Sequence, residues 1–238
     1  IPQYLLFLED VFPYMEKYHY QKGMKKIIQE LQHFIKANTY GTASDRALLL
    51  DYQATLEPKT EKAIKLEKEA LAQIKETTKK NAHLVSNLHS NLGGLYRING
   101  QLNLAKKHME MGISLLEQYQ LLYTNDSIPQ INNYAVLLIE IQEPDLALSA
   151  LQKLAQIIKE YNSNHCLDYA QVQESLGSIC LITANISQAK THFKKALKIY
   201  EDIWADEPEL IEEKYKKIQE LYPQAGIALA KSILPTKH

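Results

Sequence analysis

Residues 176–196 read LGSICLITANISQAKTHFKKA and contain the pattern that decides the fold. Apolar residues recur every three or four positions on both sides of a polar turn, as they do in amphipathic helices. Two small residues, Gly177 and Ala189, stand on the two sides of that turn. Small side chains let two antiparallel helices cross closely, because larger ones would push the helices apart. The stretch therefore predicts a hairpin of two helices.

The same pattern occurs three times with a period of 42 residues, as Ala105, Ala147 and Ala189 show on the second helix of each unit. The corresponding small residues of the first helices are Gly93, Ala135 and Gly177. No stretch alternates with the period of two that a strand would need. Such regular repetition predicts a stacked array of hairpins, which buries its apolar residues between neighbours and not in one closed core.

One period upstream, the pattern weakens. Ala63 falls at the phase of Ala105, but Asp51 occupies the small position of the first helix and Glu67 the aromatic position of the second. We therefore interpret residues 43–80 as a degenerate repeat.

The three clear units resemble the tetratricopeptide repeat (TPR), whose pattern is L-G-x-x-Y on a first helix and A-x-x-x-F-x-x-A on a second. Leu92-Gly93 with Tyr96 carries the first half of that pattern, and Ala189 with Phe193 and Ala196 carries the second. The period is similar to that of the longer repeats of kinesin light chains and of many bacterial sensor proteins. The resemblance implies an all-α fold, a right-handed TPR-like α-solenoid of antiparallel helix hairpins with about 11 to 12 helices.

The register predicts a single TPR-like array over residues 1–238. Its expected parts are an atypical helix pair (1–42), the degenerate repeat (43–80), three repeats (81–122, 123–164 and 165–205) and capping helices (206–238). The atypical pair consists of Leu5–Tyr18 and Gln21–Ala37, and an atypical first pair is typical of an end cap. The polar segments around 119–127 and 161–168 are the expected loops between units.

Composition narrows the class of protein. The chain is 45% hydrophobic and 23% charged with a formal net charge of −1, which is typical of an ordinary globular protein. No run of 18 apolar residues occurs, so we expect no membrane span. The start lacks methionine and a basic signal region, which suggests a fragment of a longer protein. Cys166 and Cys180 are too far apart along a helix for a disulfide, which is consistent with a cytoplasmic location.

The sequence predicts no catalytic residues, no metal site and no cofactor. None of the common motifs for zinc, phosphate or nucleophilic catalysis is present. His108 and His192 share a repeat phase, and we expect both to line a helix surface. Lysine and arginine are mixed with acids, and pairs such as Lys25-Lys26 and Lys79-Lys80 are too short for a nucleic-acid surface. We therefore expect no direct nucleic-acid partner.

The resemblance also implies where a partner would bind, because the first helix of each unit lines the concave face in this family. The predicted peptide- or partner-binding residues are Asn87, Asn91, Gly94, Arg97, Asn133, Val136, Glu174, Ser175 and Ser178. Asparagine carries a hydrogen-bond donor and an acceptor, so asparagines one repeat apart could hold the amides of an extended peptide. Kinesin light chains carry such an asparagine ladder. The alternative is that these asparagines tie one helix to the next.

These features predict a non-catalytic module that binds a protein or an extended peptide. One context is the C-terminal sensor or scaffold part of a larger bacterial signalling protein, resembling the arrays attached to STAND-type nucleotide-switch ATPases. The alternative is the receptor domain for a short signalling peptide in a quorum-sensing-type transcription regulator. The groove could also hold another copy of the chain in a homo-oligomer. An upstream phosphate-binding loop or an upstream helix-turn-helix would separate the two contexts.

Overall fold

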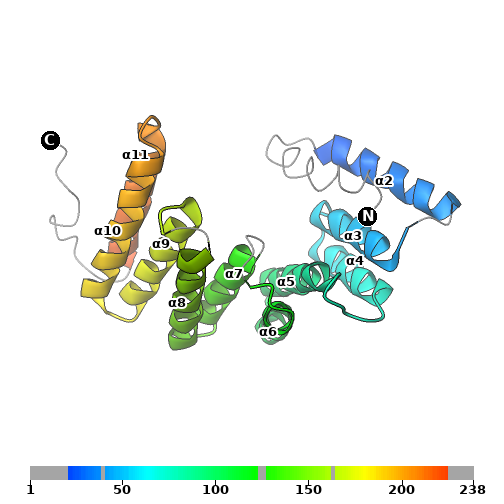
Figure 1. Ribbon diagram of the computed structural model, residues 1–238, viewed down its shortest axis with the longest axis horizontal. Coiled ribbons are helices and arrows are strands. Elements are labelled where there is room, and N and C mark those ends of the chain that lie inside the picture. The colour runs from blue at the N-terminus through cyan, green and yellow to red at the C-terminus, as the bar shows by residue number, and fades with distance from the viewer. Residues whose placement is uncertain (1–20, 39–40, 123–126, 162–163, 225–238) are drawn as a thin grey trace. The chain divides into compact units, whose positions relative to one another are not determined.

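The computed structural model describes residues 21–38, 41–122, 127–161 and 164–224, and its regular elements in these ranges are ten helices (Figure 1). The chain divides into two compact units, residues 1–121 and 122–238. Within the described residues, no helix is both long and apolar enough to cross a membrane. The predicted segment Leu5–Tyr18 and residues 225–238 of the predicted capping region lie outside the described residues.

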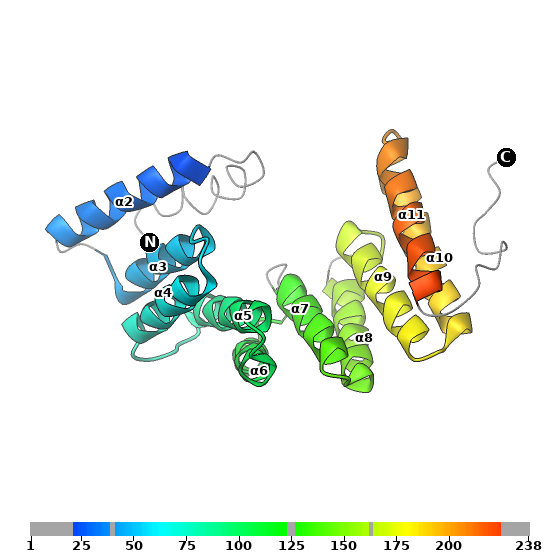
Figure 2. The same cartoon turned by 180° about the vertical axis from the view of Figure 1, so that it is seen from behind.

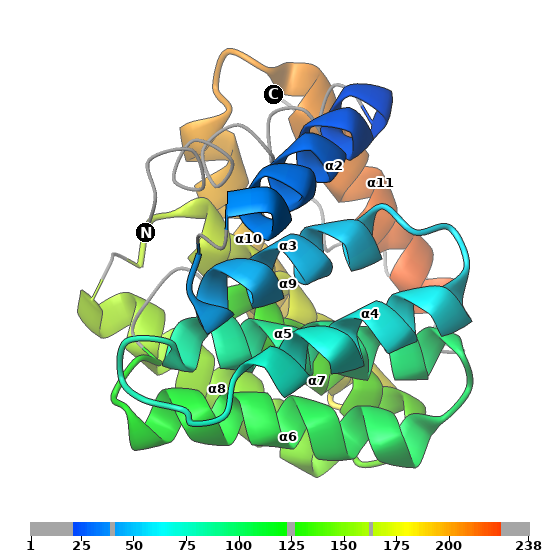
Figure 3. The same cartoon turned by 90° about the vertical axis from the view of Figure 1, so that its right-hand side faces the viewer.

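The first unit contains one helix followed by two hairpins. Its helices are α2 (Gln21–Asn38), α3 (Ala43–Thr55), α4 (Thr60–Gln73), α5 (Ala82–Ile98) and α6 (Leu102–Gln118). Consecutive helices pair most closely, α3 with α4 and α5 with α6, and α2 lies against α3 (Figure 3). Helix α3 begins with a capping box, in which Thr42 and Asp45 bond each other's backbone amides. The expected helix at 21–37 and the expected hairpin of the degenerate repeat are confirmed.

The second unit contains two hairpins and a final helix. Its helices are α7 (Ser127–Glu140), α8 (Pro144–Tyr161), α9 (Leu167–Ile182), α10 (Ile186–Ile203) and α11 (Pro208–Gln224). Helices α7 and α8 pair, as do α9 and α10, and α11 follows against α10 and α9 (Figure 2). Helix α10 is capped by Asn185, whose side chain accepts a hydrogen bond from the Gln188 amide.

The close crossing of helices within each hairpin is confirmed at the two glycines that predicted it. A β-carbon placed on Gly93 would lie 2.5 Å from Cγ of Met109, and one placed on Gly177 would lie 2.6 Å from a ring carbon of Phe193. Real β-carbons do not approach other atoms so closely, so a side chain at either position would force the hairpin apart. By contrast, a β-carbon on Gly94 would meet nothing within 4 Å.

A left-handed residue ends the first helix of each clear repeat. Gly100, Gln142 and Ala184 occupy the same repeat phase and have φ values of 73°, 62° and 59°. After each of them, the next amide bonds the carbonyl five residues earlier, for example Asn185 to Cys180 at 2.7 Å. This Schellman-type closure reverses the chain sharply, and glycine adopts it at the least cost. The turn that creates the hairpin is therefore the same in all three repeats.

Candidate functional site

In the first unit, the predicted partner-binding residues lie on α5. Asn91 is exposed, and Asn87, Gly94 and Arg97 are half-buried. The Asn91 amide nitrogen donates a hydrogen bond of 2.8 Å to Oδ1 of Asp51 on α3. Asn91 therefore ties the first helices of two successive hairpins, as the alternative interpretation of the sequence proposed.

Beneath Asn91 lies a pair of buried acids. Asp51 and Glu67 hydrogen bond to each other, and Glu67 is only 1% exposed. Burial, together with the negative charge of Asp51 and the hydrogen bond to it, raises the pKa of Glu67 to about 10. Burial also raises the pKa of Asp51, although the hydrogen bonds from Glu67 and Asn91 oppose that effect. A neutral Glu67 carboxyl therefore donates to Asp51 at neutral pH.

In the second unit, the predicted residues of α7 face solvent. Asn133 is exposed, and Val136, one turn further along the helix, is 38% exposed. On the adjacent first helix, α9, Ser175 and Ser178 are half-buried. The Ser175 hydroxyl donates to Oδ1 of Asn132 at 3.1 Å, which joins α9 to α7. We call Asn133, Val136, Ser175 and Ser178 the α7–α9 surface.

Glu174 belongs to the interior and not to this surface. Its carboxylate accepts hydrogen bonds from the Tyr200 hydroxyl at 3.0 Å and from Lys214 of α11 at 3.1 Å, and Lys217 lies 2.6 Å away. Burial acts to raise the pKa of Glu174, but the hydrogen bonds and charges of the two lysines outweigh burial and lower the pKa. The carboxylate is therefore an anchor for α11.

The contacts of Asn132 and Glu174 reveal a rule that sequence reasoning missed. The two residues occupy the same repeat phase, and each accepts a hydrogen bond from the next first helix, Asn132 from Ser175 and Glu174 from Lys214. In the second unit the accepting phase is thus one position before the predicted Asn133 and Ser175, whereas Asn91 and Ser175 share the phase that donates. The sequence did offer a signal for these ties, because Asn132 and Glu174 share a repeat phase and both side chains carry an oxygen that accepts hydrogen bonds.

Histidines make a second set of ties, within hairpins. His108 of α6 faces His89 of α5 with 2.9 Å between their Nδ1 atoms, and His192 of α10 faces Gln173 of α9 at 2.8 Å. Both contacts occupy the same repeat phase. The described ranges contain no group of three or more histidine, cysteine or acidic residues able to hold a metal ion. These histidines join the two helices of a hairpin.

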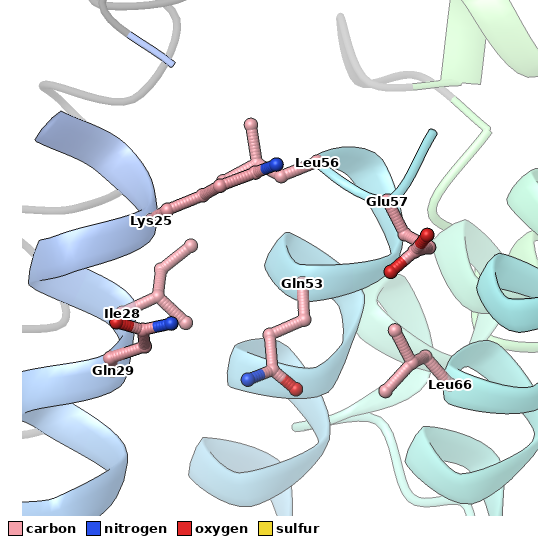
Figure 4. Close-up of a pocket in the computed structure, with 7 residues that line it drawn as sticks. All are labelled: Lys25, Ile28, Gln29, Gln53, Leu56, Glu57 and Leu66. Atoms are coloured by element: carbon pink, nitrogen blue, oxygen red, sulfur yellow. The ribbon is translucent and has the colours of Figure 1, made fainter. Parts of the chain in front are cut away.

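The hollows in the described part of the first unit include two that lie beside its helices. One, of about 380 Å³, separates α2 from the end of α3, with Lys25 and Gln29 on one wall and Gln53 and Glu57 on the other (Figure 4). The other, of about 510 Å³, lies along α5 and α6 and is lined by His89, Lys107 and Glu110 among others. Neither contains the predicted partner-binding residues.

Comparison with known proteins identifies the repeats. Residues 127–202 match the family model of the tetratricopeptide repeat. No curated protein matches the sequence of the chain. BtubC (BKLC) from P. vanneervenii has a similar structure, with 16% identity, a TM-score of 0.71 and coverage of 87% of this chain and 83% of that one.

Two further structures share the fold. The putative kinesin light chain repeats of Podospora anserina have 13% identity and a TM-score of 0.64, over 83% of this chain and 96% of theirs. A Rap protein complexed with competence and sporulation factor has 17% identity and a TM-score of 0.55, over 84% of this chain and 57% of its own. Residues 127–202 therefore match the tetratricopeptide repeat in sequence, and the fold of the chain is similar to that of kinesin-light-chain-like repeats.

Proposed function

We propose that the chain is a non-catalytic module that binds a protein or an extended peptide at the α7–α9 surface. The observation that carries the proposal is the exposure of Asn133 and Val136, one turn apart on the first helix of the region that matches the family. An asparagine amide can both donate to and accept from a peptide backbone, and valine adds apolar contact. Ser175 and Ser178 place hydroxyl groups on the adjacent first helix.

The second unit is a better candidate than the first, because of how the asparagines are used. The Asn91 amide is committed to the buried acids Asp51 and Glu67. Asn133 occupies the same repeat phase and is also exposed, but in its unit the neighbouring Asn132 makes the tie to α9. The partner-binding asparagine of this proposal is therefore Asn133, with Asn91 acting as a structural tie.

We further propose that the module is the C-terminal sensor or scaffold part of a larger bacterial signalling protein of the cytoplasm. Fold similarity to BtubC and to the kinesin light chain repeats supports a role in assembly with other proteins. A receptor for a short signalling peptide is the second candidate. The observation that favours it is the fold similarity to a Rap protein complexed with competence and sporulation factor.

Peptide selection on the immobilised chain would test the proposed surface. Peptides enriched from a random library would be measured by calorimetry against the wild type, the double variant Asn133→Ala with Val136→Ser, and the control Asn103→Ala, an exposed asparagine of α6. We expect the double variant to weaken binding about tenfold or more, with an unchanged melting temperature and an unaffected control. Equal affinity for all three proteins would refute the proposed surface.

A further inference from the structure

The solvent-facing side of α10 carries a concentrated positive charge. Lys194, Lys195 and Lys198 are exposed and Lys190 is half-buried, while the opposite side of the helix packs Ala189, Phe193, Ala196, Leu197 and Tyr200 into the interior. We call the four lysines the α10 lysine stripe. The large apolar side chains that α10 exposes are those of its terminal residues, Ile186 and Ile203, at 37% and 38%. The available chemistry on this side of α10 is therefore that of four ammonium groups.

Among the described residues of the second unit, these charges have no ion-pair partner. None of the four lysines forms an ion pair in the part of the chain that the structure describes. The two acids nearest in sequence have other partners, because Glu201 accepts a hydrogen bond from Tyr215 and Asp202 lies 3.8 Å from His165. The stripe also affects a neighbour, since burial and the charge of Lys195 lower the pKa of His192.

Helix stability does not account for the stripe. Lys190, Lys194 and Lys198 are spaced four residues apart, which places like charges side by side and destabilises the helix. Helix α10 has no acid in its first turn and no base in its last turn, so its charges do not follow the order that the helix dipole favours. Helix α4, also a second helix, pairs Lys65 with Glu69 at 3.8 Å. A local cost without a structural gain is typical of functional surfaces.

We propose that the α10 lysine stripe binds an acidic polypeptide segment of a partner protein. Lys198 lies eight positions after Lys190 on the helix, so the stripe is about 12 Å long. Lysines four positions apart are about 6 Å from each other along the helix axis. Alternate residues of an extended chain are about 6.6 Å apart. Acids four positions apart on a helix are about 6 Å apart, which is a similar spacing. A segment with three acids at either spacing therefore meets one ammonium group per acid.

An acidic polypeptide fits better than the other anionic partners. Glu201, Asp202, Glu207 and Glu209 follow the stripe directly, and these acids would repel a phosphate backbone that extended beyond it. The exposed large apolar side chains of α10 are confined to its two ends, Ile186 and Ile203, and this small apolar area disfavours insertion into a lipid surface. A short acidic segment would end before it reached these four acids, so they would not repel it. This binding is independent of the proposed function, because it uses a second helix and no residue of the α7–α9 surface.

The test measures binding of a fluorescent eight-residue polyglutamate peptide to the full chain by anisotropy. The stripe variant is Lys190→Gln, Lys194→Gln and Lys198→Gln. The matched control is Lys59→Gln, Lys62→Gln and Lys65→Gln, which removes the same charge from α4 and its N-cap residue. Circular dichroism and melting temperature verify that both variants fold.

We expect the stripe variant to weaken peptide binding about tenfold and to flatten its salt dependence, with less than about a twofold effect of the control. Equal weakening by both variants would overturn the proposal, because it would reflect net charge alone. The proposal would also be overturned if the peptide did not bind. A third contrary result would be tighter, stripe-dependent binding of single-stranded DNA or of phosphatidylserine vesicles.

Discussion

Glu67 donates a hydrogen bond to Asp51 at the position where the neighbouring hairpins place apolar side chains against small residues. The corresponding pairs are Gly93 with Met109 and Gly177 with Phe193, and in each the larger residue fills the space over the glycine. The degenerate repeat thus replaces an apolar crossing by a protonated acid and its acceptor. The second carboxyl oxygen of Glu67, Oε2, is buried without a hydrogen-bond partner.

The first prediction concerns alkaline pH. The pKa of Glu67 is about 10 in the folded chain against an ordinary 4.5, so its stabilisation is complete below 4.5 and is lost as pH rises toward 10. We expect the free energy of unfolding to fall with pH in this window by at most about 1.4 kcal/mol per unit. Glu67→Gln, which keeps a donor for Asp51, should flatten the curve in urea titrations. Glu69→Gln, on the exposed side of α4, is the control, and parallel curves for Glu67→Gln and wild type would contradict the assignment.

The second prediction concerns the helix crossing. Gly177→Leu should cost about 3 kcal/mol or more, because the new side chain would enter the space of the Phe193 ring. Gly94→Ala on α5 is the matched comparison, since open space surrounds it, and it should raise stability by about 0.5 kcal/mol. Calorimetric melting measures both variants. An unchanged melting temperature for Gly177→Leu would show that the hairpin is not packed as described.

The third prediction concerns the left-handed turn after α9. Ala184 has a φ of 59°, whereas the equivalent residue of the first clear repeat is Gly100. Ala184→Gly should therefore stabilise the chain by about 0.5 kcal/mol, because the strain of a β-carbon exceeds the added entropy of glycine. Ala184→Val should have the opposite effect, since a β-branched residue is strained further. Thermal melting of the two variants in the same direction would be inconsistent with this turn.

The fourth prediction concerns the anchor of α11. Glu174→Gln removes the negative charge that Lys214 and Lys217 approach, so amide hydrogen exchange across residues 208–221 should become faster. In wild type the folded pKa of Glu174 lies below 4.5, so this stabilisation is present above pH 4.5 and is lost as pH falls through the folded pKa. Glu213→Gln, an exposed acid of α11, serves as the control. Protection of α11 that does not change with Glu174→Gln would argue against the anchor.

The hairpins could be predicted from the sequence because their cause is local and periodic. A residue such as Gly177 is small for a reason that acts across one turn of chain, and its partner Phe193 lies within the same unit. The 42-residue register therefore predicted every hairpin that the structure describes, and the left-handed turns repeat with the same period.

The candidate site was less predictable, because it depends on how successive units meet. Asn91 and Asn133 share a repeat phase, yet Asn91 is committed to Asp51, whose acidic side chain is specific to the degenerate repeat. Glu174 fell at a predicted groove position, but the sequence pattern did not predict that α11 would pack as a following first helix and place Lys214 against it. The α10 lysine stripe was missed because charge was judged over the whole chain, where acids balance it.

The bonds accepted by Asn132 and Glu174 also specify how this protein could be lengthened by design. An additional hairpin inserted ahead of α11 would join the existing ones only if its first helix offered a hydroxyl or an ammonium donor to Glu174 and a new acceptor for Lys214. Modules copied from residues 165–205 carry both groups already, in Ser175 and Glu174. The residue at the phase of Asn132 and Glu174 is therefore the first one to choose when an array of different length is built from these hairpins.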